Sequence, residues 1–135
     1  MANQLYPKAK EDFLAGNLNL SSNVVTIALI DTDVYTFSTS HEDRADIPNS
    51  AVISEANLTS LSITSGVFDA DDPTFQSVTG ANCEALVLYH ADSQNGNTAS
   101  RLIAYIDTAT GLPILPNGGD ITVRFSTGAS KIFAL

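Results

Sequence analysis

The stretch VVTIALID, residues 24–31, decides the fold class of this 135-residue chain. Its apolar and β-branched residues run almost without interruption over the length of one strand. A strand with one solvent-exposed face would alternate apolar and polar residues. An unbroken apolar run therefore predicts a strand whose two faces are both buried. The sequence therefore predicts a sheet inside the domain, with other elements packed on either side of it.

Further short runs with strand patterns recur along the chain. They are VYTF at 34–37, LTSLSIT at 58–64, two runs within GVFDADDPTF at 66–75, EALVLYH at 84–90, RLIAYID at 101–107, ITVRFS at 121–126 and KIFAL at 131–135. Turn-forming residues separate the runs at intervals of about 8 to 12 residues, as in sandwiches, jelly rolls and small barrels. We predict one all-β domain over residues 1–135, a sandwich or jelly-roll-like fold of about seven or eight strands.

The segments between these runs predict turns and crossings. VYTF follows a turn-prone Asp-Thr-Asp and is expected to form a hairpin with the strand before it. HEDRADIPNS at 41–50 is polar and predicts a surface connection with one helical turn. An Asn-Gly pair at 95–96 predicts a turn, and the glycines and prolines of residues 107–120 predict a crossing between sheets.

One segment has helical rather than strand spacing, LYPKAKEDFLAG at residues 5–16. Pro7 suits a first helical position and Gly16 suits the C-terminal cap, which predicts a helix of about nine residues after an N-terminal arm. Its lysines precede its acidic residues, the reverse of the order that the helix dipole favours. Such a short helix needs tertiary contacts to be stable.

The apolar face of this helix is expected to include Tyr6, Phe13 and Leu14. It either closes one end of the β core or docks on a partner subunit. We favour the core, because a short amphipathic helix usually buries its apolar stripe within its own domain. The three residues are also the candidate interface residues of the chain.

The charge balance excludes two classes of partner. Fifteen acidic and six basic residues give a net charge of −9, which repels the phosphates of nucleic acid and the anionic face of a membrane. No apolar run approaches the roughly 18 residues that a membrane span needs, and the first ten residues lack the apolar run of a secretory signal. We expect a protein made in the cytoplasm that does not span a membrane. Cys83 has no second cysteine to pair with and is expected to be a small core residue.

The sequence contains no recognisable catalytic motif. There is no G-x-S-x-G, and only His41 and His90 could serve as a general base. A histidine without a partner motif is weak evidence of catalysis, so both are expected to be structural or solvated. We predict a protein that is not an enzyme and has no cofactor.

The sequence also contains no strong metal motif. No Cys/His pair has zinc spacing, and Asp69, Asp71 and Asp72 lack the full ladder of a calcium loop. We interpret these residues as an acidic turn ended by Pro73, and weak calcium binding there stays an open alternative.

Three long stretches carry a resemblance to a known family. They are LYPKAKEDFLAGNLNLSSNVVTIALIDTDVYTFS (5–38), GVFDADDPTFQSVTGANCEALVLYH (66–90) and SRLIAYIDTATGLPILPNGGDITVRF (100–125), followed by KIFAL. Together they resemble a family of small structural proteins of tailed bacteriophages. The resemblance implies a virion component, a head decoration or cement protein that binds the major capsid protein on the outer surface of the shell. It further implies a jelly-roll-like fold and a homo-oligomer, a dimer or trimer that spans joints between shell subunits.

Three rival functions stay open. The first is a tail or neck component of the same particle. The second is a carbohydrate-binding or adhesion module, which exposed Tyr35, Tyr89 or Tyr105 on one surface would support. The third is a hydrolase, which needs a histidine within hydrogen-bond reach of a serine or carboxylate in a pocket.

Overall fold

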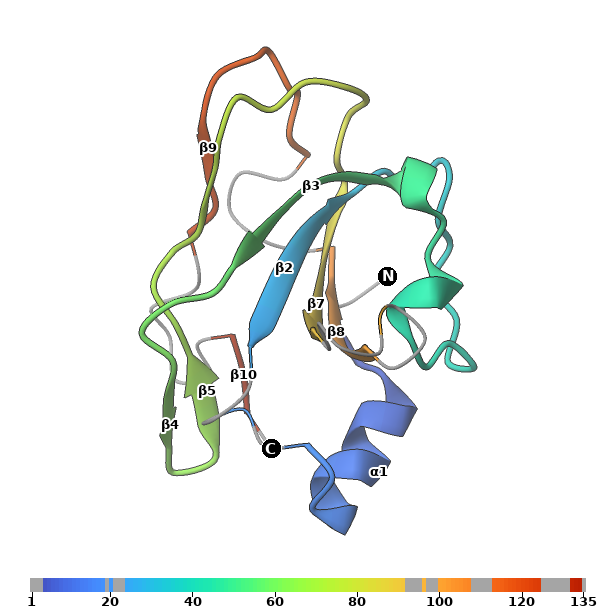
Figure 1. Cartoon of the computed structure of the whole chain (residues 1–135), viewed down its shortest axis with the longest axis vertical. Helices are drawn as coiled ribbons and strands as arrows, with labels where there is room; N and C mark the ends of the chain where they lie inside the picture. The colour runs from blue at the N-terminus through green and yellow to red at the C-terminus, as the bar shows by residue number, and fades with distance from the viewer. Residues whose placement is uncertain are drawn as a thin grey trace.

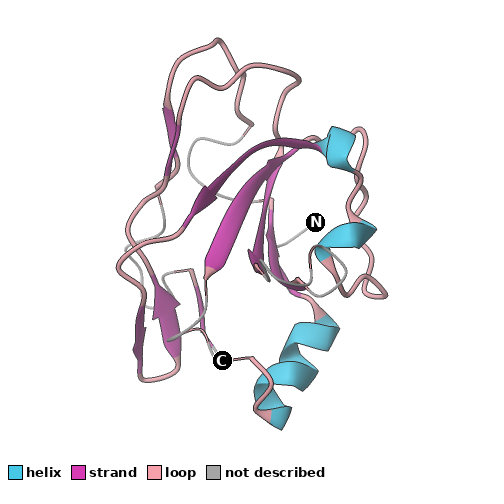
Figure 2. Cartoon of the chain, in the orientation of Figure 1, coloured by secondary structure: helices cyan, strands magenta, loops and turns pink. Residues whose placement is uncertain are grey.

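The computed structural model describes residues 4–18, 20, 24–91, 96, 100–107, 113–124 and 132–134. This described part of the chain is mostly β, with one α-helix near the N-terminus (Figures 1 and 2), which confirms the predicted fold class. The helix is α1 Pro7–Ala15, and two 3-10 turns are η1 Arg44–Asp46 and η2 Asn49–Ala51. The strands are β1 Gln4–Leu5, β2 Val25–Ile30, β3 Val52–Asn57, β4 Ser62–Thr64, β5 Val67–Asp69, β6 Thr74–Phe75, β7 Ala85–His90, β8 Arg101–Ile106, β9 Ile121–Thr122 and β10 Phe133–Ala134.

The centre of the fold is a five-stranded antiparallel sheet with the order β1-β8-β7-β2-β3. All six residues of β2 are buried, which confirms the strand covered on both faces that the unbroken apolar run predicts. The described residues also form a three-stranded sheet, β10-β5-β4, and a two-stranded ladder, β6-β9. In Figure 1 the three-stranded sheet lies to the left of β2 and the two 3-10 turns lie to its right.

The alternate residues of β2 belong to two hydrophobic cores, one on each face of the main sheet. Val25, Ile27 and Leu29 join a core that also takes the aromatic side chains of β5 and β6. Ala28 and Ile30 join the other core, which contains the tyrosine that precedes α1 and the two aromatic residues after β2. The two cores explain why the sequence of β2 is apolar throughout rather than alternating.

Tertiary contacts hold α1 against the main sheet, which the short length of the helix requires. Tyr6 donates its backbone N–H to the carbonyl of Ile103 in β8 at 2.9 Å, and the Tyr6 side chain is fully buried. Gly16 ends the helix at φ 79°, a left-handed conformation that glycine adopts without steric cost. Asp12, which lies toward the negative end of the helix dipole, pairs with Arg101 of β8, and 2.6 Å separates Asp12 Oδ2 from Arg101 Nε. This ion pair compensates for the unfavourable order of charges along the helix.

The predicted hairpin at residues 34–37 is wrong. Residues 32–34 form a turn, in which Val34 and Tyr35 donate their backbone N–H groups to the carbonyl of Asp31. β2 already pairs with β3 on one side and with β7 on the other, so no edge of β2 is free for a hairpin partner. Residues 35–37 instead bury the side chains of Tyr35 and Phe37 in the core.

The strand β3 was not predicted from the sequence. Its residues, VISEAN, mix apolar and polar side chains, because β3 is an edge of the main sheet and its side chains are only partly covered. The predicted strand at 58–64 is reduced to the three exposed residues of β4. The described part of the chain thus contains ten strands, several of two or three residues, rather than seven or eight.

The other predicted segments agree with the structure in part. β5 and β6 lie within residues 66–75 as predicted, and the acidic residues between them form a connection without regular structure. Residues 41–50 contain η1 and the start of η2, which extends to Ala51, rather than one helical turn. Of the strand predicted at 121–126, only Ile121–Thr122 is strand, and residues 123–124 are not. The segment after β8 leads from the main sheet to β9, although residues 108–112 lie outside the described residues. Residue 95 of the Asn-Gly turn, residues 125–131 and residue 135 also lie outside them. Among the described helices, none is long and apolar enough to cross a membrane.

Candidate functional site

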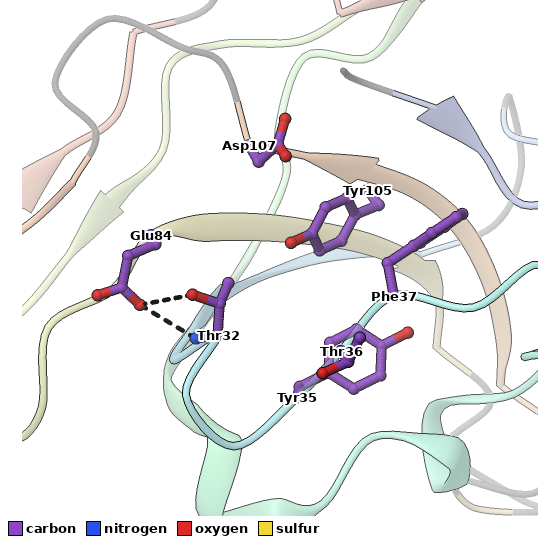
Figure 3. Close-up of a pocket in the computed structure, with 7 residues that line it drawn as sticks. All are labelled: Thr32, Tyr35, Thr36, Phe37, Glu84, Tyr105 and Asp107. Atoms are coloured by element: carbon purple, nitrogen blue, oxygen red, sulfur yellow. Dashed lines mark hydrogen bonds between the residues drawn. The ribbon is translucent and has the colours of Figure 1, made fainter. Parts of the chain in front are cut away.

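A pocket lies at one end of the main sheet, where three strand ends meet. The antiparallel register places Ile30, the last residue of β2, opposite Ala85, the first residue of β7, and places Ile106 at the end of β8 beside Leu86. Residues just beyond these ends therefore come together from distant parts of the chain. The pocket has a volume of about 380 Å³ and is lined by Thr32, Tyr35, Thr36, Phe37, Glu84, Tyr105 and Asp107 (Figure 3).

Aromatic side chains form the base of this pocket. The ring centroids of Phe37 and Tyr105 are 5.1 Å apart, and those of Tyr35 and Tyr105 are 6.3 Å apart, both in tilted arrangements. All three side chains are buried in the same core. The base of the pocket is therefore packed and keeps its shape without a ligand.

Two carboxylates give the pocket its charge. Glu84 Oε1 accepts hydrogen bonds from the backbone N–H and the hydroxyl of Thr32, each at 3.0 Å (Figure 3). Asp107 follows the end of β8, and both carboxylates are half-buried. Burial is the largest cause that raises the pKa of Tyr105, and the negative charges of Asp107 and Glu84 raise it further. None of the seven lining residues is basic, so the pocket is a region of negative potential.

Behind the pocket, three side chains share a line of hydrogen bonds. The Tyr6 and Tyr35 hydroxyls are 2.9 Å apart, and the Tyr35 hydroxyl is 2.8 Å from Nδ1 of His41. In Figure 3 the Tyr35 hydroxyl points away from Glu84. His41 thus contacts a phenol, and neither His41 nor His90 lines the pocket, so the pocket does not pair a histidine with a serine or carboxylate.

A second polar cluster lies on the same face of the main sheet. Arg44 of η1 is only 4% exposed, and its guanidinium donates to the carbonyl of Ile47 at 2.9 Å and to Asn49 Oδ1 at 3.3 Å. It also lies 3.5 Å from Glu55 of β3, which accepts a hydrogen bond from the Tyr89 hydroxyl. The cluster fastens the segment of the 3-10 turns to the sheet. The sequence predicts a surface connection at Arg44, and this is wrong for its side chain, because no local pattern distinguishes a buried arginine from a solvated one.

The three tyrosines that would support a glycan platform are buried. Tyr35 is 2% exposed, Tyr89 is 7% exposed and Tyr105 is 5% exposed. The first two use their hydroxyls in the hydrogen bonds described above. They do not form an exposed aromatic surface, so the support that the adhesion alternative needed is missing.

The candidate interface residues of the helix separate in the structure. Tyr6 is fully buried and Phe13 packs partly buried against the core, whereas Leu14 is 90% exposed. The expectation that all three share one apolar face is wrong for Leu14, because it lies on the side of α1 that faces away from the sheet. Leu14 alone of the three is available to a partner, and the interface itself stays a prediction.

The acidic stretch at residues 69–72 and Cys83 were the other candidates for chemistry in the sequence. Asp69 ends β5, and the backbone N–H of Asp71 donates to the carbonyl of Thr59. The described residues contain no group of three or more His, Cys, Asp or Glu side chains that could hold a metal ion. Cys83 is fully buried, which confirms its predicted place in the core, and burial followed by nearby carboxylates raises the pKa of its thiol to about 11.

We expect the protein to lose stability as the pH rises from 10 to 12. Burial is the largest cause that raises the pKa of Tyr35 to about 12 and that of Tyr89 to about 12, from an ordinary value of 10.0. Above pH 10 the unfolded chain releases these protons while the folded chain retains them, so rising pH favours unfolding. Urea unfolding at increasing pH, with tyrosinate absorbance recorded in parallel, measures the effect. Tyr35→Phe should make the decline shallower, and a free energy of unfolding that stays constant to pH 12 would contradict the prediction.

Every described residue that lines the pocket lies within residues 5–38, 66–90 or 100–125. The same stretches supply α1, β2 and β5 to β9. They therefore account for both the scaffold and the pocket. No protein-family model and no curated protein sequence matches this chain.

Proposed function

We propose that this protein is a non-enzymatic decoration, or cement, protein of a tailed-phage head. It binds the outer surface of the shell through the major capsid protein and bridges neighbouring shell subunits. The observation that carries the proposal is the resemblance of residues 5–38, 66–90 and 100–125 to small phage structural proteins. Under this proposal the protein resides on the capsid surface after synthesis in the host cytoplasm.

The architecture supports such a role because the domain is well packed. Both faces of the main sheet are covered, and the strands β2, β7 and β8 are almost entirely buried. Contacts between shell subunits are individually weak and many times repeated, so a rigid domain that bridges two subunits stabilises the shell through effective concentration. Bridging as a dimer or trimer would multiply this effect, because each copy adds a linked contact.

The chemistry of the pocket also supports binding rather than catalysis. Its described polar lining consists of two carboxylates, two threonines and the Tyr105 hydroxyl. Among the described residues the lining holds no histidine, cysteine or lysine. The Tyr35 hydroxyl contacts His41 Nδ1, but this contact lies behind the pocket, and the Thr32 hydroxyl donates to Glu84. A pocket of this composition is suited to hold a group by charge and hydrogen bonds.

The copy number of the protein in purified particles tests the proposal. Quantitative mass spectrometry would measure it against the major shell protein, with a tail protein of the same particle as an internal reference. A ratio that is a simple, sizeable fraction of the shell protein is expected. A handful of copies would indicate the tail or neck instead, and absence from the particle would overturn the proposed function.

A further inference from the structure

The pocket at the end of the main sheet has the composition of a site for an organic cation. The two carboxylates and the threonine hydroxyls supply hydrogen-bond acceptors, and none of the described residues that line the pocket is positively charged. Thr32 already donates both its N–H and its hydroxyl to Glu84 Oε1, which fixes the orientation of that carboxylate. The site is therefore rich in acceptors and preorganised before a ligand arrives.

The Tyr105 hydroxyl adds a third kind of polar group to the pocket. Every buried side-chain nitrogen or oxygen among the described residues has a hydrogen-bond partner, and the structure shows none for the Tyr105 hydroxyl, so this hydroxyl reaches solvent in the pocket. Figure 3 shows it pointing toward the Glu84 side. Burial raises the pKa of this hydroxyl, and the negative charges of Asp107 and Glu84 raise it further.

A guanidinium group complements this arrangement better than a metal ion or a neutral ligand. Calcium prefers six to eight oxygen ligands, and the described residues hold no group of three metal-ligating side chains. A guanidinium is planar, always charged and carries five N–H donors and no acceptor, so it matches two carboxylates and a hydroxyl. It also packs favourably against aromatic rings such as those of Phe37 and Tyr105 at the base.

We propose that this pocket receives an arginine side chain of the partner protein, held between Glu84 and Asp107 above the aromatic base. The partner's identity as the major capsid protein rests on the proposed function, whereas the chemistry of the pocket does not. The net charge of −9 adds long-range attraction toward a basic patch that surrounds such an arginine.

The first experiment titrates the intact protein with N-acetyl-arginine amide and follows backbone amide signals by NMR. The amides of Thr32 and Asp107 should shift, with a dissociation constant on the order of 1 mM for one side chain in isolation. N-acetyl-citrulline amide has nearly the same shape and no charge, and it should not bind. No shift at these amides at about 10 mM arginine probe, or equal shifts with both probes, would overturn the inference.

Isosteric variants identify the carboxylates that hold the probe. Glu84→Gln and Asp107→Asn should each weaken binding of the arginine probe about tenfold. Asp71→Asn removes the same charge from an exposed position outside the pocket and should leave binding unchanged. If all three variants weaken binding equally, overall charge rather than the pocket attracts the probe, and the inference fails.

A second experiment measures binding of the same variants to purified shells that lack this protein. Wild type and Asp71→Asn should bind, and the double variant Glu84→Gln/Asp107→Asn should bind at least tenfold more weakly. If the double variant binds as tightly as wild type, the inference is overturned while the proposed function stands. If wild type does not bind shells at all, the proposed function fails, and with it the capsid protein as the source of the arginine.

Discussion

Leu88→Ala is expected to lower the free energy of unfolding by about 3 kcal/mol, as large-to-small substitutions in well-packed cores do. Leu88 is fully buried in β7, where Ile27 of β2 and Ala104 of β8 lie directly opposite it in the register. Two strands and the small sheets enclose the side chain, so the cavity left by the substitution cannot collapse easily. Urea denaturation of the purified protein, followed by circular dichroism, measures the change.

Leu14→Ala is the matched control, because the same substitution is made at a residue that is 90% exposed. It should change the free energy of unfolding by less than about 0.5 kcal/mol. Equal losses in the two variants would contradict the structure. Leu14→Ala also tests the predicted interface: a loss of shell binding with unchanged stability would place α1 at the contact with the partner.

Arg44→Met is expected to lower the free energy of unfolding by about 2 kcal/mol. Methionine retains much of the aliphatic stem, but the carbonyl of Ile47 and the side chain of Asn49 lose their charged donor. The expected loss lies below the roughly 3 to 5 kcal/mol of a fully buried ion pair, because solvent reaches Glu55 and screens its charge. Urea denaturation again measures the change.

Arg124→Met is the matched control for this prediction, because Arg124 is exposed just after β9. The free energy of unfolding of Arg124→Met should lie within about 0.5 kcal/mol of that of wild type. If Arg44→Met and Arg124→Met have the same free energy of unfolding, the contacts of Arg44 with the 3-10 turns and Glu55 contribute nothing to stability. Hydrogen exchange at the amides of residues 44–47 would then also be expected to stay unchanged.

The sequence predicts those elements whose pattern reflects a simple environment. The runs that form β2, β7 and β8 are apolar because both faces of these strands are covered, and an unbroken apolar run can be recognised from the sequence alone. The helix was equally visible, since Pro7 and Gly16 act locally at its two ends. β3 was missed because an edge strand with half-covered side chains has no clear period.

The pocket was not predicted from the sequence. More than fifty residues separate Thr32 from Glu84, and more than twenty separate Glu84 from Asp107. No motif near any of the three residues indicates a binding site. Only the antiparallel register of β2, β7 and β8 brings them to the same end of the sheet.

The sequence alone indicates the fold class, the three central strands and the capped N-terminal helix. Strands buried on both faces appear as unbroken apolar runs, and the helix is marked by a proline at its start and a glycine at its end. Tertiary structure alone decided that residues 34–37 fold into the core instead of forming a hairpin, that Arg44 is buried while Leu14 is exposed, and that two distant carboxylates share one pocket. The reason is that these outcomes depend on which edges and faces are already occupied. Occupancy is a property of the assembled sheet and cannot be read from any single segment.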